Sequence, residues 1–321
     1  MTERVGEFDL IARHFTRPVR HAALGVGDDC ALVNVAPGQQ LAVSSDMLVE
    51  GRHFLSTVAP ERLGHKALAV NLSDLAACGA EPLAFTLALA LPRADEAWAA
   101  GFASGMFALA DAQGIELVGG DTTAGPLNIC ITVMGQVPVG QALLRSGAQA
   151  GDELWVSGTL GDARLALEVF RGTRALHGEA FDTVRRAMEQ PQPRVALGLA
   201  LRGLASSAID LSDGLLGDLG HVLRRSCVGA LLQADSLPRS SILSAQPLAL
   251  QRLCTLAGGD DYELLFTAPA ARHEAVLAAG HQAGVAVTCC GHITGSAGLR
   301  IVDAAGQELD AQSWRGFDHF A

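Results

Sequence analysis

Aspartates recur at the ends of short apolar runs in this chain. LAVSSD ends at Asp46, IELVGGD ends at Asp121, and SSAIDLSD supplies Asp210 and Asp213. The ends of strands are places where a rigid scaffold commonly presents functional groups. For any single one of these motifs a plain turn is the simpler interpretation, because Asp and Gly both suit turns. Their repetition favours a shared ligand.

Two further segments add acidic side chains. GVGDDCA places Asp28 and Asp29 side by side in a turn flanked by glycines. KALAVNLSDLAACGA places Asn71 and Asp74 three residues apart, so they share one face of an otherwise apolar helix. A carboxylate such as Asp74 is costly to bury unless it is paired or bound to a metal. Lys66 is the only lysine of the chain, so ammonium partners are scarce.

An excess of hard oxygen ligands indicates magnesium, which typically binds one or two carboxylates per ion together with substrate phosphates. The aspartates therefore predict several Mg²⁺ ions around a polyphosphate. The segment ERLGHKALA, which contains Lys66, does not match the Walker A pattern, and the motifs of protein kinases are missing. A nucleotide bound by this chain would be held by other means than lysines.

Other polar motifs leave two interpretations open. Arg145, in LLRSGAQAGD, is a candidate phosphate clamp because a guanidinium can bind two phosphate oxygens at once, and a solvated linker arginine fits equally well. GGDDYELLF (258–266) places two aspartates and Glu263 before an apolar strand, which a tight acidic hairpin would explain just as well. Histidines such as His53 show no metal-ligand spacing, and an isolated histidine is more often structural.

The composition sets the class of protein. The 321 residues predict two globular domains, and the formal net charge of −11 argues against a nucleic-acid partner. No apolar run approaches the roughly 20 residues of a membrane span, so no membrane partner is expected. The N-terminal sequence lacks a secretory signal, which predicts a cytoplasmic location. Seven cysteines without a CxxC pair predict buried thiols rather than disulfides or a zinc site.

Apolar periodicity predicts a mixed α/β chain. The predicted strands are Leu41 to Ser45, Leu83 to Leu91, Ile115 to Val118, Leu127 to Val137, Glu153 to Ser157, Ala208 to Leu211, Tyr262 to Thr267 and Val285 to Gly291. The predicted helices are Glu61 to Cys78, Asp95 to Gln113, Asp162 to Phe170, Arg194 to Leu204, Leu215 to Arg225 and Pro269 to Ala283. Turn residues in 137–152 break the pattern, so we expect an N-terminal domain of residues 1–138 and a C-terminal domain of residues 139–321.

Nine motifs, in this order, resemble those of the thiamine-monophosphate kinase family. They are GEF (6–8), GVGDDCA (25–31), SSDMLVEGRHF (44–54), KALAVNLSDLAACGAEP (66–82), VGGDTTAGP (118–126), RSGAQAGDELWVSGTLGDA (145–163), DLSDGLLGDLGH (210–221), GGDDYELLF (258–266) and GFDHF (316–320). Any one of them alone is weak, whereas the ordered set is specific and covers essentially the full chain.

The resemblance implies a fold and an activity. The fold is the two-domain, mixed α/β (α+β) fold of aminoimidazole ribonucleotide synthetase, with an N-terminal sheet used for dimerisation and a C-terminal α/β domain that completes the nucleotide and substrate site. The activity is transfer of the ATP γ-phosphoryl group to thiamine monophosphate, with several Mg²⁺ ions and ATP as co-substrate, in a homodimer. Because the acceptor is an already ionised phosphate oxygen, we expect direct in-line transfer without a phosphoenzyme.

The resemblance also implies three groups of site residues, carried over by motif position. The metal ligands are Asp28, Asp29, Ser44, Ser45, Asp46, Asp74, Asp121, Asp210 and Asp213. The nucleotide-binding residues are Gly120, Asp121, Arg145 and Ser212, and the residues that face thiamine phosphate are His53, Asp260 or Glu263, and Phe317. Asp46, Asp121 and Asp210 are expected to matter most for catalysis.

Two positions depart from the family pattern. Asp260 stands where family members usually carry glutamate, one methylene longer, and Arg52 fills a position that is commonly apolar. The rival interpretations are another ATP-using enzyme of the same fold and a non-catalytic nucleotide-binding regulator. A selenophosphate synthetase would need a reactive cysteine or selenocysteine near the N-terminus, and a hydrogenase-maturation dehydratase a C-terminal cysteine. The first segment, MTERVGEF, and the last, DHFA, contain no cysteine, so neither of these two enzymes is expected.

Overall fold

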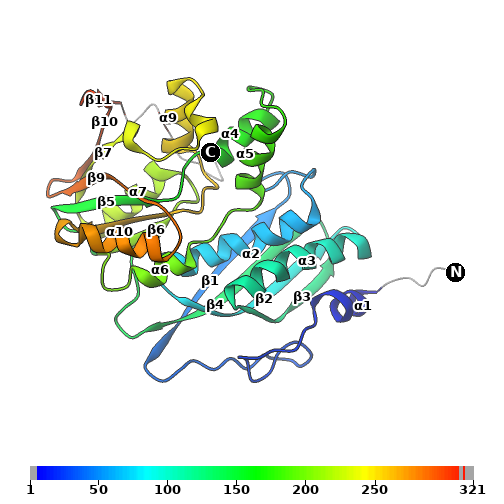
Figure 1. Cartoon of the computed structure of the whole chain (residues 1–321). Helices are drawn as coiled ribbons and strands as arrows, with labels where there is room; N and C mark the ends of the chain where they lie inside the picture. Colours follow the sequence, from blue (N-terminus) through cyan, green and yellow to red (C-terminus); the bar gives the residue numbers. More distant parts are fainter. Residues whose placement is uncertain (1–5, 311–313, 315–321) are drawn as a thin grey trace. The chain divides into compact units, whose positions relative to one another are not determined.

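The computed structural model describes residues 6–310 and residue 314, and the chain forms two compact units (Figure 1). Within the described residues, the first unit comprises 6–75 and 80–140, and the second comprises 76–79, 141–310 and 314. The predicted division into domains 1–138 and 139–321 stays a prediction about where independently folding parts begin and end.

The first unit is built on a four-stranded sheet. Its strands are β1 (Gln39–Val49), β2 (Glu81–Leu91), β3 (Glu116–Ala124) and β4 (Asn128–Pro138), in the order β1-β4-β2-β3. β4 is antiparallel to both of its neighbours, and β2 and β3 are parallel. The helices α2 (Pro60–Ala77) and α3 (Glu96–Gln113) cover one face of this sheet (Figure 1). The short helix α1 (Glu7–Leu10) and a π-helical turn (Ile11–Phe15) precede the sheet.

Two glycines allow α2 and α3 to pack closely. A Cβ atom at Gly105 would lie 1.7 Å from the carbonyl oxygen of Glu61, and one at Gly64 would lie 2.0 Å from the carbonyl oxygen of Phe102. Helix backbones approach this closely only where side chains are absent. α3 then ends at Gly114, whose φ of 66° is the left-handed conformation typical of a helix C-terminus.

The other face of this sheet, which we call the open face, carries several exposed side chains in the single chain. Successive strand residues point to opposite faces, and Ser44 points toward α2, where its hydroxyl contacts Asp74. Val43 and Met47 therefore point away from the helices, together with Leu41. These three side chains are 58%, 53% and 47% exposed, respectively. An exposed row of large apolar side chains on one face indicates an interaction surface.

The second unit is built on a seven-stranded sheet of order β11-β10-β7-β9-β5-β8-β6. Its strands are β5 (Asp152–Ser157), β6 (Ser207–Asp210), β7 (Gly229–Gln233), β8 (Leu264–Pro269), β9 (Val287–Thr294), β10 (Gly298–Val302) and β11 (Glu308–Leu309). Its α-helices are α4 (Asp162–Phe170), α5 (Glu179–Glu189), α6 (Val195–Ala200), α7 (Leu215–Ser226), α8 (Ser241–Ser244), α9 (Leu248–Ala257) and α10 (His273–Gln282).

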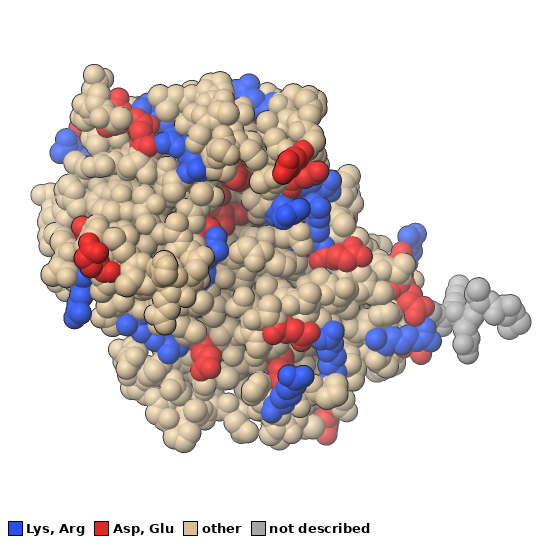
Figure 2. Space-filling view, in the orientation of Figure 1, with Lys and Arg blue, Asp and Glu red and all other residues tan. Residues whose placement is uncertain are grey.

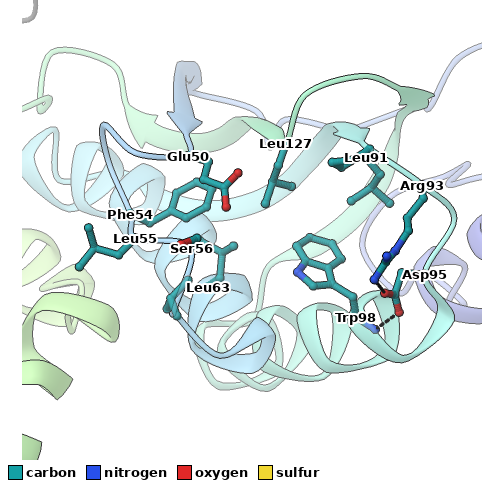
Figure 3. Close-up of a pocket in the computed structure, with 12 residues that line it drawn as sticks. Glu50, Phe54, Leu55, Ser56, Leu63, Leu91, Arg93, Asp95, Trp98 and Leu127 are labelled. Carbon is teal, nitrogen blue, oxygen red and sulfur yellow. Dashed lines mark hydrogen bonds and ion pairs between the residues drawn. The ribbon is translucent and has the colours of Figure 1, made fainter.

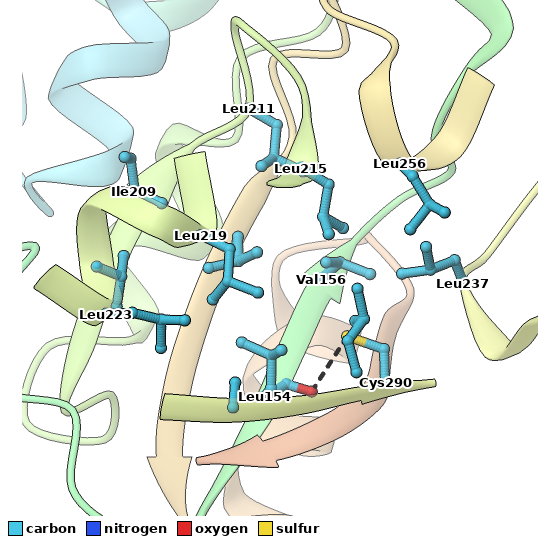
Figure 4. Close-up of a cluster of buried hydrophobic side chains, with 14 of the residues drawn as sticks. Leu154, Val156, Ile209, Leu211, Leu215, Leu219, Leu223, Leu237, Leu256 and Cys290 are labelled. Atoms are coloured by element: carbon cyan, nitrogen blue, oxygen red, sulfur yellow. Dashed lines mark hydrogen bonds between the residues drawn. The ribbon is translucent and has the colours of Figure 1, made fainter. Parts of the chain in front are cut away.

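The core of the second unit lies between this sheet and α7. Figure 4 shows Leu215, Leu219 and Leu223 projecting from α7 toward Leu154 of β5. Leu219 and Leu154 are fully buried. Cys290 belongs to the same cluster, and its thiol donates a hydrogen bond to the carbonyl oxygen of Leu154 over 3.4 Å. This packing fixes β6 and α7, which carry the aspartates of DLSDGLLGDLGH.

Two predictions from the sequence are wrong in the structure. Asp46 and Asp121 lie inside strands rather than at strand ends, because pairing with β4 carries β1 on to Val49 and pairing with β2 carries β3 on to Ala124. The prediction of buried thiols is confirmed for Cys254 and Cys290. It is wrong for Cys30, which is exposed on a loop, and for Cys227, which is exposed at the end of α7.

The surface carries charges of both signs. Figure 2 shows Lys and Arg side chains interspersed with Asp and Glu side chains over the described residues of the face drawn. Among the helices that the structure describes, none combines the length and apolar character needed to cross a membrane. The sequence carries a net charge of −11, so the balance of the whole chain is acidic.

Candidate active site

Strand β1 and helix α2 bring four polar side chains together, which we call the β1–α2 cluster: Ser44, Asp46, Asn71 and Asp74. The Ser44 hydroxyl donates to Asp74 Oδ2 over 2.5 Å, and the Asp46 backbone N–H donates to Asn71 Oδ1 over 3.0 Å. Asn71 and Asp74 share one face of α2, as predicted. Asn71 is 1% exposed. The cluster is therefore a fixed set of oxygen atoms.

Asp121 lies on the other face of the sheet from Asp46. The strand register aligns Asp46 in one row with Gly120, and Met47 in the next row with Asp121. Neighbouring rows point to opposite faces. β1 and β3 are moreover the two edge strands, so three strand spacings, about 14 Å, separate these aspartates. A single copy of the chain therefore does not place Asp46 and Asp121 on the same ion.

Three further predicted metal ligands of the first unit are exposed. Asp28 and Asp29 lie in a loop closed by the pairing of Leu24 with Leu32, and the Asp28 carboxylate accepts the Asp29 backbone N–H. Ser45 lies on the open face of the sheet, where its hydroxyl is 2.9 Å from that of Thr132. None of these three therefore belongs to the β1–α2 cluster.

Gly120, a predicted nucleotide-binding residue, is required by the backbone. Its φ is 148°, and a Cβ atom there would lie 1.9 Å from the carbonyl oxygen of Leu87 on β2. Only glycine fits this close approach. The exposed backbone beside Asp121 is therefore free of side-chain bulk at this point.

His53 lies in the turn after β1, held from two sides. Its Nδ1 accepts the Val49 backbone N–H over 3.0 Å, which assigns the ring proton to Nε2. The Lys66 ammonium donates to the His53 carbonyl oxygen over 3.1 Å, and Lys66 is only 2% exposed. Sequence reasoning missed Lys66 as a positioning residue. The available signal was a single lysine within an apolar helical run.

In the second unit, two predicted motifs lie side by side. The Leu211 backbone N–H donates to the Glu263 carbonyl oxygen over 2.8 Å, and the Asp260 N–H donates to the Ser212 carbonyl oxygen over 2.9 Å. These bonds place GGDDYELLF along the end of β6, next to DLSDGLL. Asp210, the last residue of β6, is 5% exposed. The structure thus brings Asp210, Ser212 and Asp260 into one local region.

A buried carboxylate that sequence reasoning missed lies below Asp213. The Asp218 carboxylate on α7 accepts the Asp213 backbone N–H over 3.3 Å. Burial and then the charge of Asp213 raise the pKa of Asp218 to about 7, which the charge of Arg145 partly opposes. Arg145 itself is exposed, and its carbonyl oxygen accepts the Ser226 hydroxyl. The carboxylates of Asp213 and Asp218 therefore lie close together, and Arg145 is near enough to act on Asp218.

Glu263 is an interior residue. Its Oε2 accepts the Ser157 hydroxyl over 2.5 Å and Arg194 Nε over 2.6 Å, and Arg194 Nη2 binds its Oε1. Burial alone would lower the pKa of Arg194, but the hydrogen bond and charge of Glu263 outweigh it and raise that pKa. Asp260 is half-buried, and its Oδ1 accepts the Tyr262 hydroxyl. Phe317, the remaining predicted substrate residue, lies outside the described residues.

The donor chemistry fits magnesium bound together with a polyphosphate. Within residues 6–310 and 314, no group of three or more His, Cys, Asp or Glu side chains is close enough to hold a metal ion unaided. Mg²⁺ needs only one or two carboxylates when substrate phosphates complete its shell. The β1–α2 cluster supplies such oxygens, as does the pair Asp213 and Asp218, in which burial first and then the charge of Asp213 raise the pKa of Asp218.

Comparison with known proteins defines the class of protein first. The model of the N-terminal domain of AIR synthase related proteins matches residues 27–137, and that of the C-terminal domain matches residues 149–304. The two units and their sheets are those of an AIR synthase-like protein. Thiamine-monophosphate kinase of Salmonella typhimurium is 46% identical over 325 residues, which cover 98% of each chain. The chain therefore belongs to the thiamine-monophosphate kinase family.

Solved structures agree with this assignment. The crystal structure of thiamine-monophosphate kinase from Stenotrophomonas maltophilia is 45% identical, covers 94% of this chain and 95% of its own, and superposes with a TM-score of 0.85. AaThiL complexed with AMPPCP and TMP is 27% identical, covers 89% of each chain, and superposes with a TM-score of 0.76. The fold predicted from the motifs is thereby confirmed.

Proposed function

We propose that this chain transfers the γ-phosphoryl group of ATP to thiamine monophosphate, giving thiamine diphosphate and ADP. The observation that carries the proposal is full-length identity of 46% to a thiamine-monophosphate kinase. A related structure, AaThiL, is complexed with AMPPCP, an ATP analogue, and TMP. A reaction that consumes ATP is consistent with a cytoplasmic location, which we propose as well.

The chemistry asks the protein for positioning and charge neutralisation rather than for a strong base. The acceptor oxygen of a phosphate is already ionised near neutral pH, so in-line transfer without a phosphoenzyme is sufficient. Mg²⁺ bound to the β1–α2 cluster, Asp121, Asp210 and Asp213 would neutralise the polyphosphate and the acceptor against their mutual repulsion. Arg145 is our candidate clamp on the nucleotide, and His53 and Asp260 are our candidates for orienting thiamine phosphate.

The direct test is incubation with ATP, Mg²⁺ and thiamine monophosphate. We expect one ADP for each thiamine diphosphate formed and no turnover of free thiamine. Chelation of divalent ions should abolish the activity, because the carboxylates of the site repel the substrate phosphates when no cation lies between them. Added Mg²⁺ should restore the activity, and the circular dichroism spectrum should stay unchanged throughout. Turnover of free thiamine would refute the assignment of thiamine monophosphate as the acceptor. Tight ATP binding without ADP release would favour the alternative of a non-catalytic nucleotide-binding regulator.

The positions of Asp46 and Asp121 support a homodimer as the working unit. If both aspartates serve one polyphosphate, a single protomer cannot supply them, since they lie on opposite faces of the sheet at opposite edges. The open face carries exposed Leu41, Val43 and Met47, an apolar surface suited to a second copy. We therefore propose that two copies associate through the open face of this sheet.

Substitution Val43→Asp is expected to convert the dimer to monomers and to lower activity with it. Val43 is 58% exposed, so the monomer tolerates the change, whereas a carboxylate in an apolar interface is costly. Sedimentation velocity measures the mass. The matched control is Leu248→Asp, on an exposed apolar residue of α9 in the second unit, which should leave the mass unchanged. A Val43→Asp protein that remains a dimer would exclude this face as the interface.

A further inference from the structure

The hydroxyl of Ser226, the last residue of α7, is bound by the loop that carries Arg145. It donates to the Arg145 carbonyl oxygen over 3.2 Å. It also accepts the backbone N–H groups of Gly147 and Ala148, over 3.1 Å and 3.2 Å. A hydroxyl has one proton to donate and two lone pairs that accept, so these three hydrogen bonds use its full capacity. Ser226 therefore fastens the backbone of this loop to α7.

The same loop is also fastened to β6. The Leu144 carbonyl oxygen accepts the Ala208 backbone N–H over 2.9 Å. A Cβ atom at Gly147 would lie 2.3 Å from the Ser206 carbonyl oxygen, so the loop passes closely over the segment that leads into β6. Arg145 thus lies between two backbone anchors, one on β6 and one on α7. Its backbone is fixed although its side chain is exposed.

The charge of Arg145 acts along α7. Burial, and then the charges of Arg224 and Arg145, lower the pKa of His221. Burial raises the pKa of Asp218 to about 7, and the charge of Arg145 opposes that rise. From Ser226 back to His221 the helix advances five residues, or about 7.5 Å, which is comparable to the reach of an extended arginine side chain. The guanidinium therefore lies back along α7 from its anchor, toward His221 and Asp218.

The guanidinium of Arg145 has its charge available. It makes no hydrogen bond or ion pair with residues 6–310 or 314. Arg93, at the rim of a pocket of about 310 Å³ in the first unit, is different, as Figure 3 shows. Its Nη2 donates to Asp95 Oδ2 over 3.1 Å, so its charge is already offset by a carboxylate. Arg145 therefore combines an anchored backbone with a cation that is free to bind an anion.

The other end of α7 holds a proposed metal ligand. The Asp218 carboxylate accepts the Asp213 backbone N–H over 3.3 Å. Leu219, in the same helix, is fully buried in the core of the second unit, which holds α7 in place (Figure 4). One fixed helix therefore sets the spacing between Asp213 and the loop of Arg145.

We propose that Ser226 is a positioning residue for the nucleotide. It holds the backbone of Arg145 so that the guanidinium meets the ATP phosphates beside the metal ion bound at Asp213. Ser226 itself touches neither substrate. The inference rests on the proposed function, in which Arg145 is the clamp on the nucleotide, and it adds the residue through which α7 aligns that clamp.

The test measures binding rather than turnover. The dissociation constant Kd of AMPPCP with Mg²⁺ is determined by isothermal titration calorimetry. Ser226→Ala should raise this Kd about tenfold, because a misplaced Arg145 loses a charged hydrogen bond to a phosphate. Alanine suits a helix at least as well as serine, so thermal melting should change little. Ser226→Thr keeps the hydroxyl and should bind AMPPCP within about threefold of the wild-type protein.

A double variant shows whether Ser226 acts through Arg145. Arg145→Met should itself raise the Kd about tenfold, and adding Ser226→Ala to it should raise the Kd no further. The KM for ATP should follow the Kd in all these variants, with the KM for thiamine monophosphate unchanged. The matched control is Ser236→Ala, which removes an exposed hydroxyl that donates to the Gln233 carbonyl oxygen over 2.9 Å in the same unit. It should bind AMPPCP as the wild-type protein does.

The results separate this inference from the proposed function. An unchanged Kd in Ser226→Ala or in Arg145→Met overturns the inference, as does a Kd in Ser226→Thr as weak as that in Ser226→Ala. A further rise in the double variant also overturns it and indicates a general structural role. If Ser226→Ala fails to fold, Ser226→Cys decides by the same measurement, since its thiol is only a weak donor and acceptor. A wild-type protein that binds AMPPCP but forms no thiamine diphosphate would refute the proposed function alone.

Discussion

The variants Asp46→Asn and Asp121→Asn should each lower kcat by several orders of magnitude with the fold intact. Asparagine keeps the shape of aspartate but loses the charge that a divalent cation needs from its ligand. The β1–α2 cluster itself should persist in Asp46→Asn, because the bond from Asp46 to Asn71 comes from the backbone N–H. Steady-state ADP release measures kcat, and thermal melting checks the fold. Near-normal activity in either variant would remove that residue from the proposed metal ligands.

Mixing the two inactive variants should restore activity. If each active site takes Asp46 from one copy and Asp121 from the other, a mixed dimer contains one site with both substitutions and one intact site. Random assortment of equal amounts then gives about a quarter of the wild-type activity. Co-expression with two different affinity tags isolates the mixed dimer, in which half of the sites should work.

The same experiment has a clear negative result. A mixed dimer that is as inactive as its parents would show that every site carries one of the two substitutions. The two aspartates of each site would then come from one chain. The register of the sheet, which separates Asp46 from Asp121 by three strand spacings, argues against that result. Mixed dimers of Asp46→Asn with the wild-type protein provide the reference for one intact site per dimer.

Local periodicity predicted what depends on one helix, and missed what depends on strand partners. Asn71 and Asp74 share a face of α2 because helical geometry alone places residues three apart together. Asp46 and Asp121 were expected at strand ends, but the length of a strand is set by its neighbour, and β1 continues as far as β4 can pair with it. In the same way β8 begins at Leu264 rather than at Tyr262, whose φ of 50° interrupts the extended backbone.

The second unit was predicted less completely than the first. The unassigned elements include α5, α9 and the short strands β7, β10 and β11. GALLQ in β7 and GLRIV in β10 are each five residues long and become strands by pairing in parallel with one another, a contact between segments far apart in the sequence. No local pattern encodes such a pairing. The motifs nevertheless identified the family, since their order along the chain requires no knowledge of pairing.

In the candidate site, too, the sequence predicted residues that belong to motifs and missed those whose role depends on tertiary packing. Motif position named Asp210, Ser212 and Asp260, and the structure joins their segments through backbone hydrogen bonds. Asp218 escaped notice because its importance comes from burial next to Asp213, which only the tertiary packing of α7 produces. For Glu263, motif position implied a contact to substrate, while the structure shows both carboxylate oxygens bound by Arg194 and Ser157.

Replacing Arg194 by methionine is therefore expected to lower the free energy of unfolding by about 3–5 kcal/mol, because it leaves the Glu263 carboxylate buried without its cation. Glu263 is 5% exposed, so water cannot take the place of the guanidinium. Urea unfolding monitored by tryptophan fluorescence measures the change. The exposed pair Arg300 and Glu308 provides the matched control, and Arg300→Met should change stability by no more than about 1 kcal/mol.

A second substitution separates a structural Glu263 from one that binds substrate. In the double variant Arg194→Met, Glu263→Gln the buried charge is gone and the amide oxygen can still accept the Ser157 hydroxyl, so most of the lost stability should return. If Glu263 binds thiamine phosphate instead, Glu263→Gln alone would raise the KM for that substrate with little loss of stability. Recovery of stability in the double variant, with the KM unchanged, would leave Asp260 as the carboxylate of this segment that can face the acceptor.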